Sequence, residues 1–356
     1  MSENNIIGNT GIEVIEPLQD ERIIDIVNQV STRIMTAFPN NNLSYLDIYK
    51  TLLDTPMYYA KIPKGLSKAN YYYKDSSIYF SNNANISEID EFIFHEFIHR
   101  LQERRDKKGN ITRLGVCEVN ELSVKGTALN EGAIQYVTTK AFHSPSKMVN
   151  IYNIAIPSRT EYYPIITNII SQLAFLLGEN FLIDSTINGN EEFKIDIIDN
   201  IGESEYHTIE KNLNDILRLK NEIAVVQSSI QLKDMWQVPN NDKKTKIDEN
   251  IKLIRNIYFD TQNKIFMSYF NSLLKRAEND IEVNMIRKKL QDYATLVGTA
   301  DDYNSFETYC IEFEKQAEQK MEELKNKNAL VVLKDNFVYR IIRKIKRLLK
   351  RSEREN

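Results

Sequence analysis

The chain of 356 residues is poor in several residue types: it has 11 glycines, 8 prolines, 4 histidines, 2 cysteines and 1 tryptophan. With so few glycines, it has no glycine-rich loop that could cradle a phosphate, and it has no GxSxG sequence that would place a nucleophilic serine. The two cysteines, Cys117 and Cys310, lie far apart in sequence. So low a cysteine content fits a reducing compartment.

Long apolar runs are also missing. The longest apolar-rich stretch, Tyr163 to Gly178, is interrupted by Thr167, Asn168 and further polar residues. It is too short and too polar for a membrane span, and we expect a buried helix there. The first residues, Met1 to Asn5, have neither a basic nor an apolar segment, so we expect no secretory signal and a cytoplasmic location.

Charge and length complete this frame. The formal net charge is −4, which gives no overall reason to expect nucleic-acid binding. With 42% hydrophobic residues, a chain of this length can bury a sizeable core and is expected to hold two domains.

Against this background, one pentapeptide is the most informative feature of the chain. His95, Glu96 and His99 form an HExxH sequence within an apolar stretch that has helical periodicity. We expect this helix to begin with a capping-box-like start at Ser87 and Asp90 and to end in a charged run that closes at Gly109. Two histidines four residues apart lie on one face of a helix, so both imidazoles can reach one metal ion. The glutamate between them can contact a water on that metal without being a ligand. The motif therefore predicts two zinc ligands and a general base, with one Zn²⁺ per chain.

A catalytic zinc needs a third protein ligand and one open position. The metzincin continuation would require glycine at 102 and histidine at 105, but the chain has Gln102 and Arg105 there. We predict Glu131 as the third ligand, because it lies in a second helical pattern that begins Ala128-Leu129-Asn130 and continues through Gly132 to Val137.

This pair of segments resembles the gluzincin metallopeptidases, in which an HExxH helix is followed by a helix that carries a glutamate ligand. The Leu-Asn-Glu-Gly sequence at 129–132 is similar to that second helix, and the resemblance covers about residues 70 to 180. It implies zinc-dependent peptide hydrolysis. In one respect the chain departs from the family: 31 residues lie between His99 and Glu131, more than in the best-known members. Glu118 and Glu121 lie nearer to the usual distance and remain alternative ligands.

Two more features bear on a peptidase site. Residues 70–73 and 78–81 are predicted to form two strands around a polar turn, and a zincin-like enzyme uses such a hairpin to present an edge strand to an extended substrate. A second electrophile is also expected to stabilise the developing oxyanion. The candidates are Tyr162, Tyr163, His143 and His207, of which we select Tyr163 because it directly precedes a helix expected to pack on the core.

The whole pattern predicts an α+β fold that is predominantly helical. We expect N-terminal helices within residues 1–56, at 18–38 and 43–54, and a zincin-like domain with a small antiparallel or mixed sheet at 57–238. A linker near 239–244 should precede a helical C-terminal domain at 245–335.

The last segment, residues 336–356, is predicted to be a basic amphipathic helix. Residues 340–356 carry eight basic and two acidic side chains, a charge of +6, so the rest of the chain carries −4 − 6 = −10. This asymmetry favours peripheral contact with an anionic membrane, at the inner face for a cytoplasmic protein. Docking of the apolar face on the protein itself is the alternative.

The sequence thus predicts a soluble zinc metallopeptidase whose partner is a peptide or protein substrate and not a nucleic acid. His95, His99 and Glu131 would bind zinc, which lowers the pKa of a coordinated water toward about 7, and Glu96 would be the general base. Two alternatives stay open: a non-catalytic interaction protein on a zincin scaffold, and a zinc hydrolase that acts on a non-peptide amide.

Overall fold

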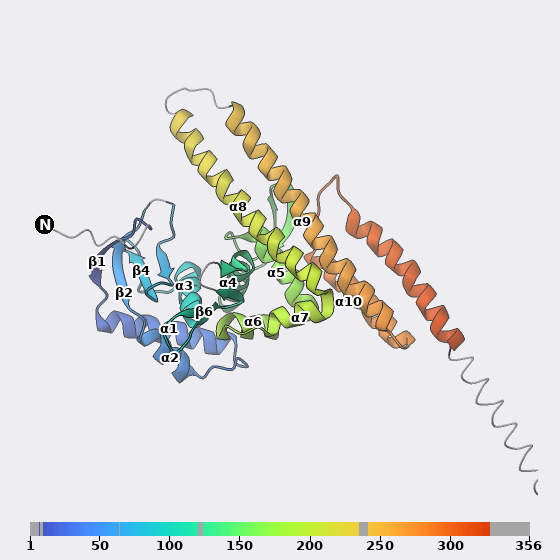
Figure 1. The fold of residues 1–356 in the computed structure, drawn as a ribbon, viewed down its shortest axis with the longest axis horizontal. Helices are drawn as coiled ribbons and strands as arrows, with labels where there is room; N and C mark the ends of the chain where they lie inside the picture. Colours follow the sequence, from blue (N-terminus) through green and yellow to red (C-terminus); the bar gives the residue numbers. More distant parts are fainter. Residues whose placement is uncertain (1–6, 8–9, 64, 120–123, 235–240, 328–356) are drawn as a thin grey trace, which may run out of the picture. The chain divides into compact units, whose positions relative to one another are not determined.

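The computed structural model describes residues 7, 10–63, 65–119, 124–234 and 241–327. The fold is α+β and predominantly helical, as predicted (Figure 1). It divides into two compact units: one runs to Phe266 and includes Leu296–Tyr303, and the other comprises Met267–Thr295 and the residues from Asn304 on. The boundary between the two units falls within helix α9 (Asn241–Arg276). The units are distinguished by the packing within each of them and not by a break between helices. The domain boundaries predicted from the sequence remain predictions.

The first sheet of the larger unit has four strands in the order β1-β2-β4-β3. They are β1 (Glu13–Pro17), β2 (Met57–Lys61), β3 (Ala69–Tyr72) and β4 (Ser77–Ser81). Strands β2 and β4 are parallel, whereas β3 and β4 form an antiparallel hairpin. The hairpin predicted for residues 70–81 is therefore confirmed, and its first strand, β3, lies at the edge of the sheet.

The two predicted N-terminal helices are confirmed as α1 (Asp20–Ala37) and α2 (Tyr45–Leu53). Helix α2 begins with a capping box between Ser44 and Asp47. Both helices bury aliphatic side chains in a core that also contains Phe80 of the sheet and Phe97 of the HExxH helix. Residues before position 57 therefore share a hydrophobic core with the HExxH segment, and this core fixes one face of that helix.

The HExxH helix, α3, spans Glu91–Leu101. Its N-cap is Asp90, whose side chain accepts from the backbone N–H of Ile93 at 3.1 Å. The expected start at Ser87 was therefore three residues early. The charged run after the helix is not a helical end closing at Gly109 but a β-hairpin: β5 (Glu103–Arg105) pairs with β6 (Ile111–Leu114). Strands β7 (Cys117–Val119) and β8 (Val124–Lys125) complete this second sheet.

The second predicted helix of the site is α4 (Thr127–Ala141), which is buried on almost every side. It packs on α5 (Pro164–Leu177), the buried helix predicted for the apolar stretch. A Cβ atom on Gly132 would come within 2.8 Å of both Ile166 and Ile170 of α5. Only glycine permits so close an approach of α4 to α5, which explains the glycine that follows Glu131.

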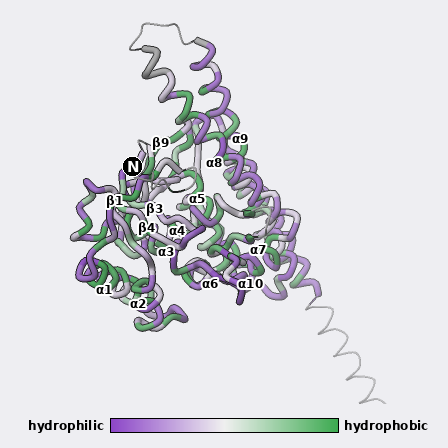
Figure 2. The backbone as a smooth tube through the Cα atoms, turned by 60° about the vertical axis from the view of Figure 1, so that its left-hand side comes forward, coloured by the Kyte–Doolittle hydropathy of each residue, from purple (hydrophilic) through white to green (hydrophobic). Residues whose placement is uncertain are grey.

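The remaining elements of the larger unit are a hairpin and four helices. They are β9 (Lys147–Ile151), β10 (Ile154–Ser158), α6 (Glu179–Asn188), α7 (Glu192–Ile201), α8 (Glu203–Asp234) and most of α9. Hydrophilic and hydrophobic residues are interspersed along α8 and α9 (Figure 2). Within the described residues no single helix is long and apolar enough to cross a membrane; α5 and α6 pass such a test only as a pair bent by 119°.

Within the described residues the smaller unit is helical, as predicted for the C-terminal segment at 245–335. It contains the end of α9, helix α10 (Asp280–Tyr293) and a further helix at residues 305–327. Aromatic side chains hold it together: Phe270 packs edge-on against Tyr293 and Phe313. The basic segment at 336–356 lies outside the described residues, so the amphipathic helix predicted there remains a prediction.

Candidate metal centre

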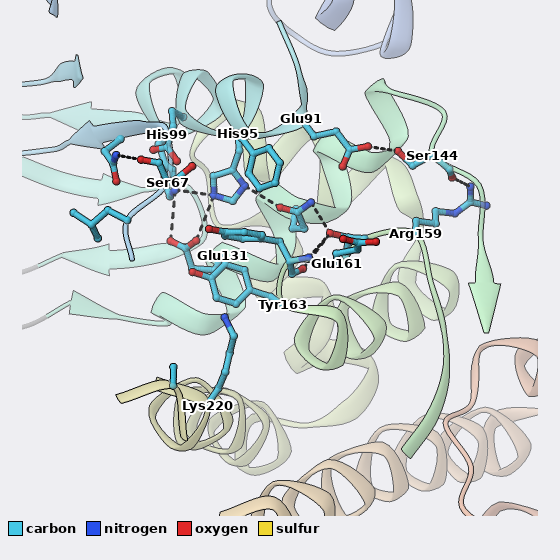
Figure 3. A pocket seen from close by; sticks show the side chains of 18 of the residues that line it. Ser67, Glu91, His95, His99, Glu131, Ser144, Arg159, Glu161, Tyr163 and Lys220 are labelled. Carbon is cyan, nitrogen blue, oxygen red and sulfur yellow. Dashed lines mark hydrogen bonds and ion pairs between the residues drawn. The ribbon is translucent and has the colours of Figure 1, made fainter. Parts of the chain in front are cut away.

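The side chains of His95, His99 and Glu131 converge at one point between α3 and α4 (Figure 3). The Nε2 atoms of His95 and His99 are 3.2 Å apart, as expected for imidazoles one helical turn apart. Each Nε2 atom also lies near a carboxylate oxygen of Glu131, at 3.4 Å for His95 and 3.5 Å for His99. Within the described part of the chain, these three side chains form a group that could hold a metal ion.

The separations between the donor atoms fit a small tetrahedral ion. Zinc binds nitrogen and oxygen at about 2.0–2.1 Å, so two ligands at tetrahedral positions are about 3.3 Å apart. The three separations, 3.2, 3.4 and 3.5 Å, scatter around this value. Two imidazoles and one carboxylate are also a donor set typical of catalytic zinc, and they leave the fourth position open.

The outer nitrogens of both imidazoles are held by glutamine side chains. Nδ1 of His95 is 3.2 Å from Oε1 of Gln135, whose amide nitrogen donates to Thr160 at 2.8 Å. On the other ring, Nδ1 of His99 is 3.0 Å from the amide of Gln102. Exchanging the nitrogen and oxygen of the Gln102 amide lets Nδ1–H donate to Oε1, a buried oxygen that otherwise has no partner. Both rings would then direct an unprotonated Nε2 at the ion.

The electrostatics of the group favour a carboxylate at Glu131. Burial by itself would raise the pKa of Glu131, but the neighbouring imidazoles of His99 and His95 outweigh burial and lower the pKa to about 2. Burial lowers the pKa of His99 to about 4, so this imidazole is neutral and ready to coordinate. Burial opposes protonation of His95 too, yet the hydrogen bond and charge of Glu131 raise its pKa. A metal ion and a proton would compete for the Nε2 atom of His95.

Glu96, the predicted base, is fixed by the edge strand. Its Oε2 accepts a hydrogen bond of 2.7 Å from the backbone N–H of Tyr71 in β3. The ring of Tyr71 also stacks on His99, with 7° between the ring planes. Burial, with a smaller contribution from the charge of Glu131, raises the pKa of Glu96 to about 8, although His95 opposes the rise. A bound dication would favour the carboxylate form.

The three side chains of the group and Glu96 line a cavity of about 740 Å³. Tyr162 and Tyr163 line the same cavity, and the predicted electrophile Tyr163 has a left-handed backbone conformation with φ +50° just before α5. Burial and the negative charge of Glu131 raise the pKa of Tyr163, so its hydroxyl keeps its proton at neutral pH and can donate a hydrogen bond. A residue that the sequence did not reveal, Lys220 of α8, completes this wall (Figure 3).

The other sequence candidates lie elsewhere or outside the description. Glu118 of β7 is half-exposed and forms an ion pair with Lys194, so the structure does not bring it to the histidines. Glu121 lies outside the described residues. His143 lines a separate hollow beside α1, and His207 is an exposed residue of α8 whose nearest carboxylate is Glu210 at 3.9 Å.

Comparison of the chain with protein-family models, with curated proteins and with solved structures finds no match. The functional argument therefore rests on the geometry of this centre and on the sequence that forms it.

Proposed function

We propose that the protein is a zinc-dependent hydrolase of peptide bonds with a zincin-like domain of gluzincin type. The observation that carries the proposal is the convergence of both HExxH imidazoles with Glu131, at separations that suit a tetrahedral ion, in a cavity that substrate can enter. Zinc at this position would act as a Lewis acid on the peptide carbonyl and would lower the pKa of water toward about 7.

The protein's own groups would carry the proton. One carboxylate oxygen of Glu96 is held by the N–H of Tyr71, which leaves the other oxygen to accept the proton of the attacking water. Glu96 would then deliver that proton to the nitrogen of the leaving amine. The hydroxyl of Tyr163 is proposed to donate a hydrogen bond to the carbonyl oxygen as negative charge develops on it.

The edge strand, β3, lies beside the metal centre, and its outward-facing backbone groups contact the protein itself. The carbonyl of Lys68 accepts from the N–H of Ser81, so the backbone groups of Lys68 and Asn70 face β4. Because these directions alternate along a strand, the groups of Ala69 and Tyr71 face away from β4, and the bond from Tyr71 to Glu96 agrees with this. Ala69 is fully buried and the N–H of Tyr71 is already bonded to Glu96, so the pairing of an extended substrate with this strand remains a prediction from the sequence.

Metal analysis and a peptide-library cleavage assay test the proposal together. We expect one zinc per chain, lost in His95→Ala and His99→Ala and strongly weakened in Glu131→Ala. The matched control, Glu118→Ala, removes a carboxylate that points elsewhere and should retain zinc.

The variant Glu96→Gln separates catalysis from metal binding. It should keep both zinc and fold because the amide is nearly isosteric, yet it should lose about 10²–10⁴-fold in hydrolysis. If the wild type and Glu96→Gln are equally inert towards all peptides, the non-catalytic scaffold or a non-peptide amide substrate replaces the peptidase. If both cleave equally well, Glu96 is not the base.

A further inference from the structure

Lys220 lies at the metal-site cavity but has no role in binding the metal. It extends from α8, and its Nζ atom lies over the ring of Tyr163, 4.1 Å from the ring centre, and 5.8 Å from that of Tyr162 (Figure 3). Its neighbours Asn221 and Ala224 line the same wall. The ammonium group is therefore held in place by two aromatic rings and faces the space beside Glu131.

This cation is partly buried without a carboxylate partner. Among the residues that the structure describes, no carboxylate oxygen lies within 4.0 Å of Nζ of Lys220. The group is desolvated enough for burial to lower its pKa, and the charge of Glu131 only partly offsets this. Once Glu131 neutralises a metal dication, its attraction for Lys220 weakens further. A cation withdrawn from water without a counter-charge is costly, and a bound anion would relieve that cost.

The other two cations among the described residues that line the cavity are Lys147 and Arg159. Lys147 pairs with Glu161 at 3.5 Å, and Ser144 donates to Glu91 at 2.5 Å. The Nη1 atom of Arg159 donates to the backbone carbonyl of Ser144 at 2.7 Å. Lys220 differs from both because it lies over Tyr163 and its charge acts on Glu131, so it is placed to meet a negative group of the substrate beside the metal centre.

We infer that Lys220 is a specificity-determining residue that binds a carboxylate of the peptide substrate. This inference rests on the proposed function and names a substrate class for it: peptides that carry a carboxylate near the scissile bond. That carboxylate comes either from the free C-terminus or from an acidic side chain, and both would form the same charge-assisted hydrogen bond with Nζ.

Equilibrium binding tests the inference without turnover. The zinc-loaded Glu96→Gln protein is titrated with acetylated neutral hexapeptides in two matched pairs. The first comparison is between a free C-terminus and a C-terminal amide. The second is between glutamate and glutamine in an amidated peptide, made with the residue at each position in turn. We expect a preference of about tenfold or more in Kd for the carboxylate member of at least one pair.

Variants then assign that preference to Lys220. In Lys220→Met, which keeps the length and the apolar stem, the preference should disappear while zinc content and the binding of neutral peptides stay the same. Lys220→Arg should keep part of it. The matched control is Lys147→Met, which removes a cation of the same cavity that is exposed and already paired, and should keep the full preference.

Three outcomes would overturn the inference: no preference in the parent protein, a preference that survives Lys220→Met, or an equal loss of neutral and acidic peptides in that variant. The pair that shows the preference identifies the source of the carboxylate. Failure of the proposed hydrolysis is seen separately, in the cleavage assay that compares wild type with Glu96→Gln.

Discussion

A single methyl group added at Gly115 should weaken the metal centre from outside it. Gly115 lies in the turn between β6 and β7 with φ +58°, and its N–H donates to the carbonyl of Gln102 at 3.2 Å. A Cβ atom there would overlap the side-chain oxygens of Gln102 and Asn130, far inside the 3.0 Å limit of real contacts. Gln102 is fully buried, so its amide must leave the position from which it holds His99.

Two effects of Gly115→Ala can be sized separately. The left-handed backbone costs about 1–2 kcal/mol for any residue with a Cβ atom. Displacing the buried amide of Gln102 costs roughly a further 1–3 kcal/mol of folding free energy, because a buried hydrogen bond is lost. Loss of the group that orients a histidine ligand lowers metal affinity by about 10–100-fold.

Gly109→Ala is the matched control, because Gly109 has φ +85° and nothing within 4 Å of an added Cβ atom. It should share the backbone cost and leave zinc affinity unchanged. Zinc Kd is measured by competition with a chromophoric chelator, and stability by urea unfolding of the metal-free proteins. Gln102→Met, which removes the amide without touching the turn, should reproduce the loss of affinity. Equal zinc Kd values for Gly115→Ala and Gly109→Ala would refute the reasoning.

Three further predictions concern other parts of the chain. The ion pair with Lys194 lowers the pKa of Glu118 below the unfolded glutamate value of about 4.5. At pH values above 4.5, Glu118→Gln should therefore lower the free energy of unfolding by up to about 1 kcal/mol. Urea unfolding at a series of pH values should show this difference vanish as the pH falls through the lowered folded pKa. Burial raises the pKa of the Cys117 thiol, so in alkylation at pH 8 followed by mass spectrometry Cys117 should react more slowly than the less buried Cys310, and equal rates would contradict this. The full chain should co-sediment with phosphatidylglycerol-containing vesicles in a salt-sensitive way and a chain ending at Asp335 should not; equal behaviour of the two favours docking of the basic segment on the protein.

The sequence alone determined what depends on local periodicity. Two histidines at positions i and i+4 share a face of any α-helix, so the HExxH pair could be placed before the fold was known. The hairpin at 69–81 and the buried helix at 164–177 follow from equally local patterns of alternation and apolar content. The start of α3 was misplaced because Ser87 and Asp90 are both good capping residues, and the sequence pattern did not choose between them.

Only the tertiary structure decided which distant groups meet the histidines. It selected Glu131 over Glu118, since the packing of α4 on α5 at Gly132 aims one carboxylate at α3 while the strand β7 directs the other to Lys194. It also supplied the N–H of Tyr71 to Glu96, a backbone contact that no residue type encodes.

The same holds for the supporting groups. Gln102 and Gln135 are ordinary polar residues until folding places them against the imidazoles. Lys220 carries no motif, and it reaches the cavity because α8 packs against α4 far along the chain. Sequence periodicity predicts which face of a helix or strand is apolar. Which charged side chains from separate elements lie close together depends on how those elements pack.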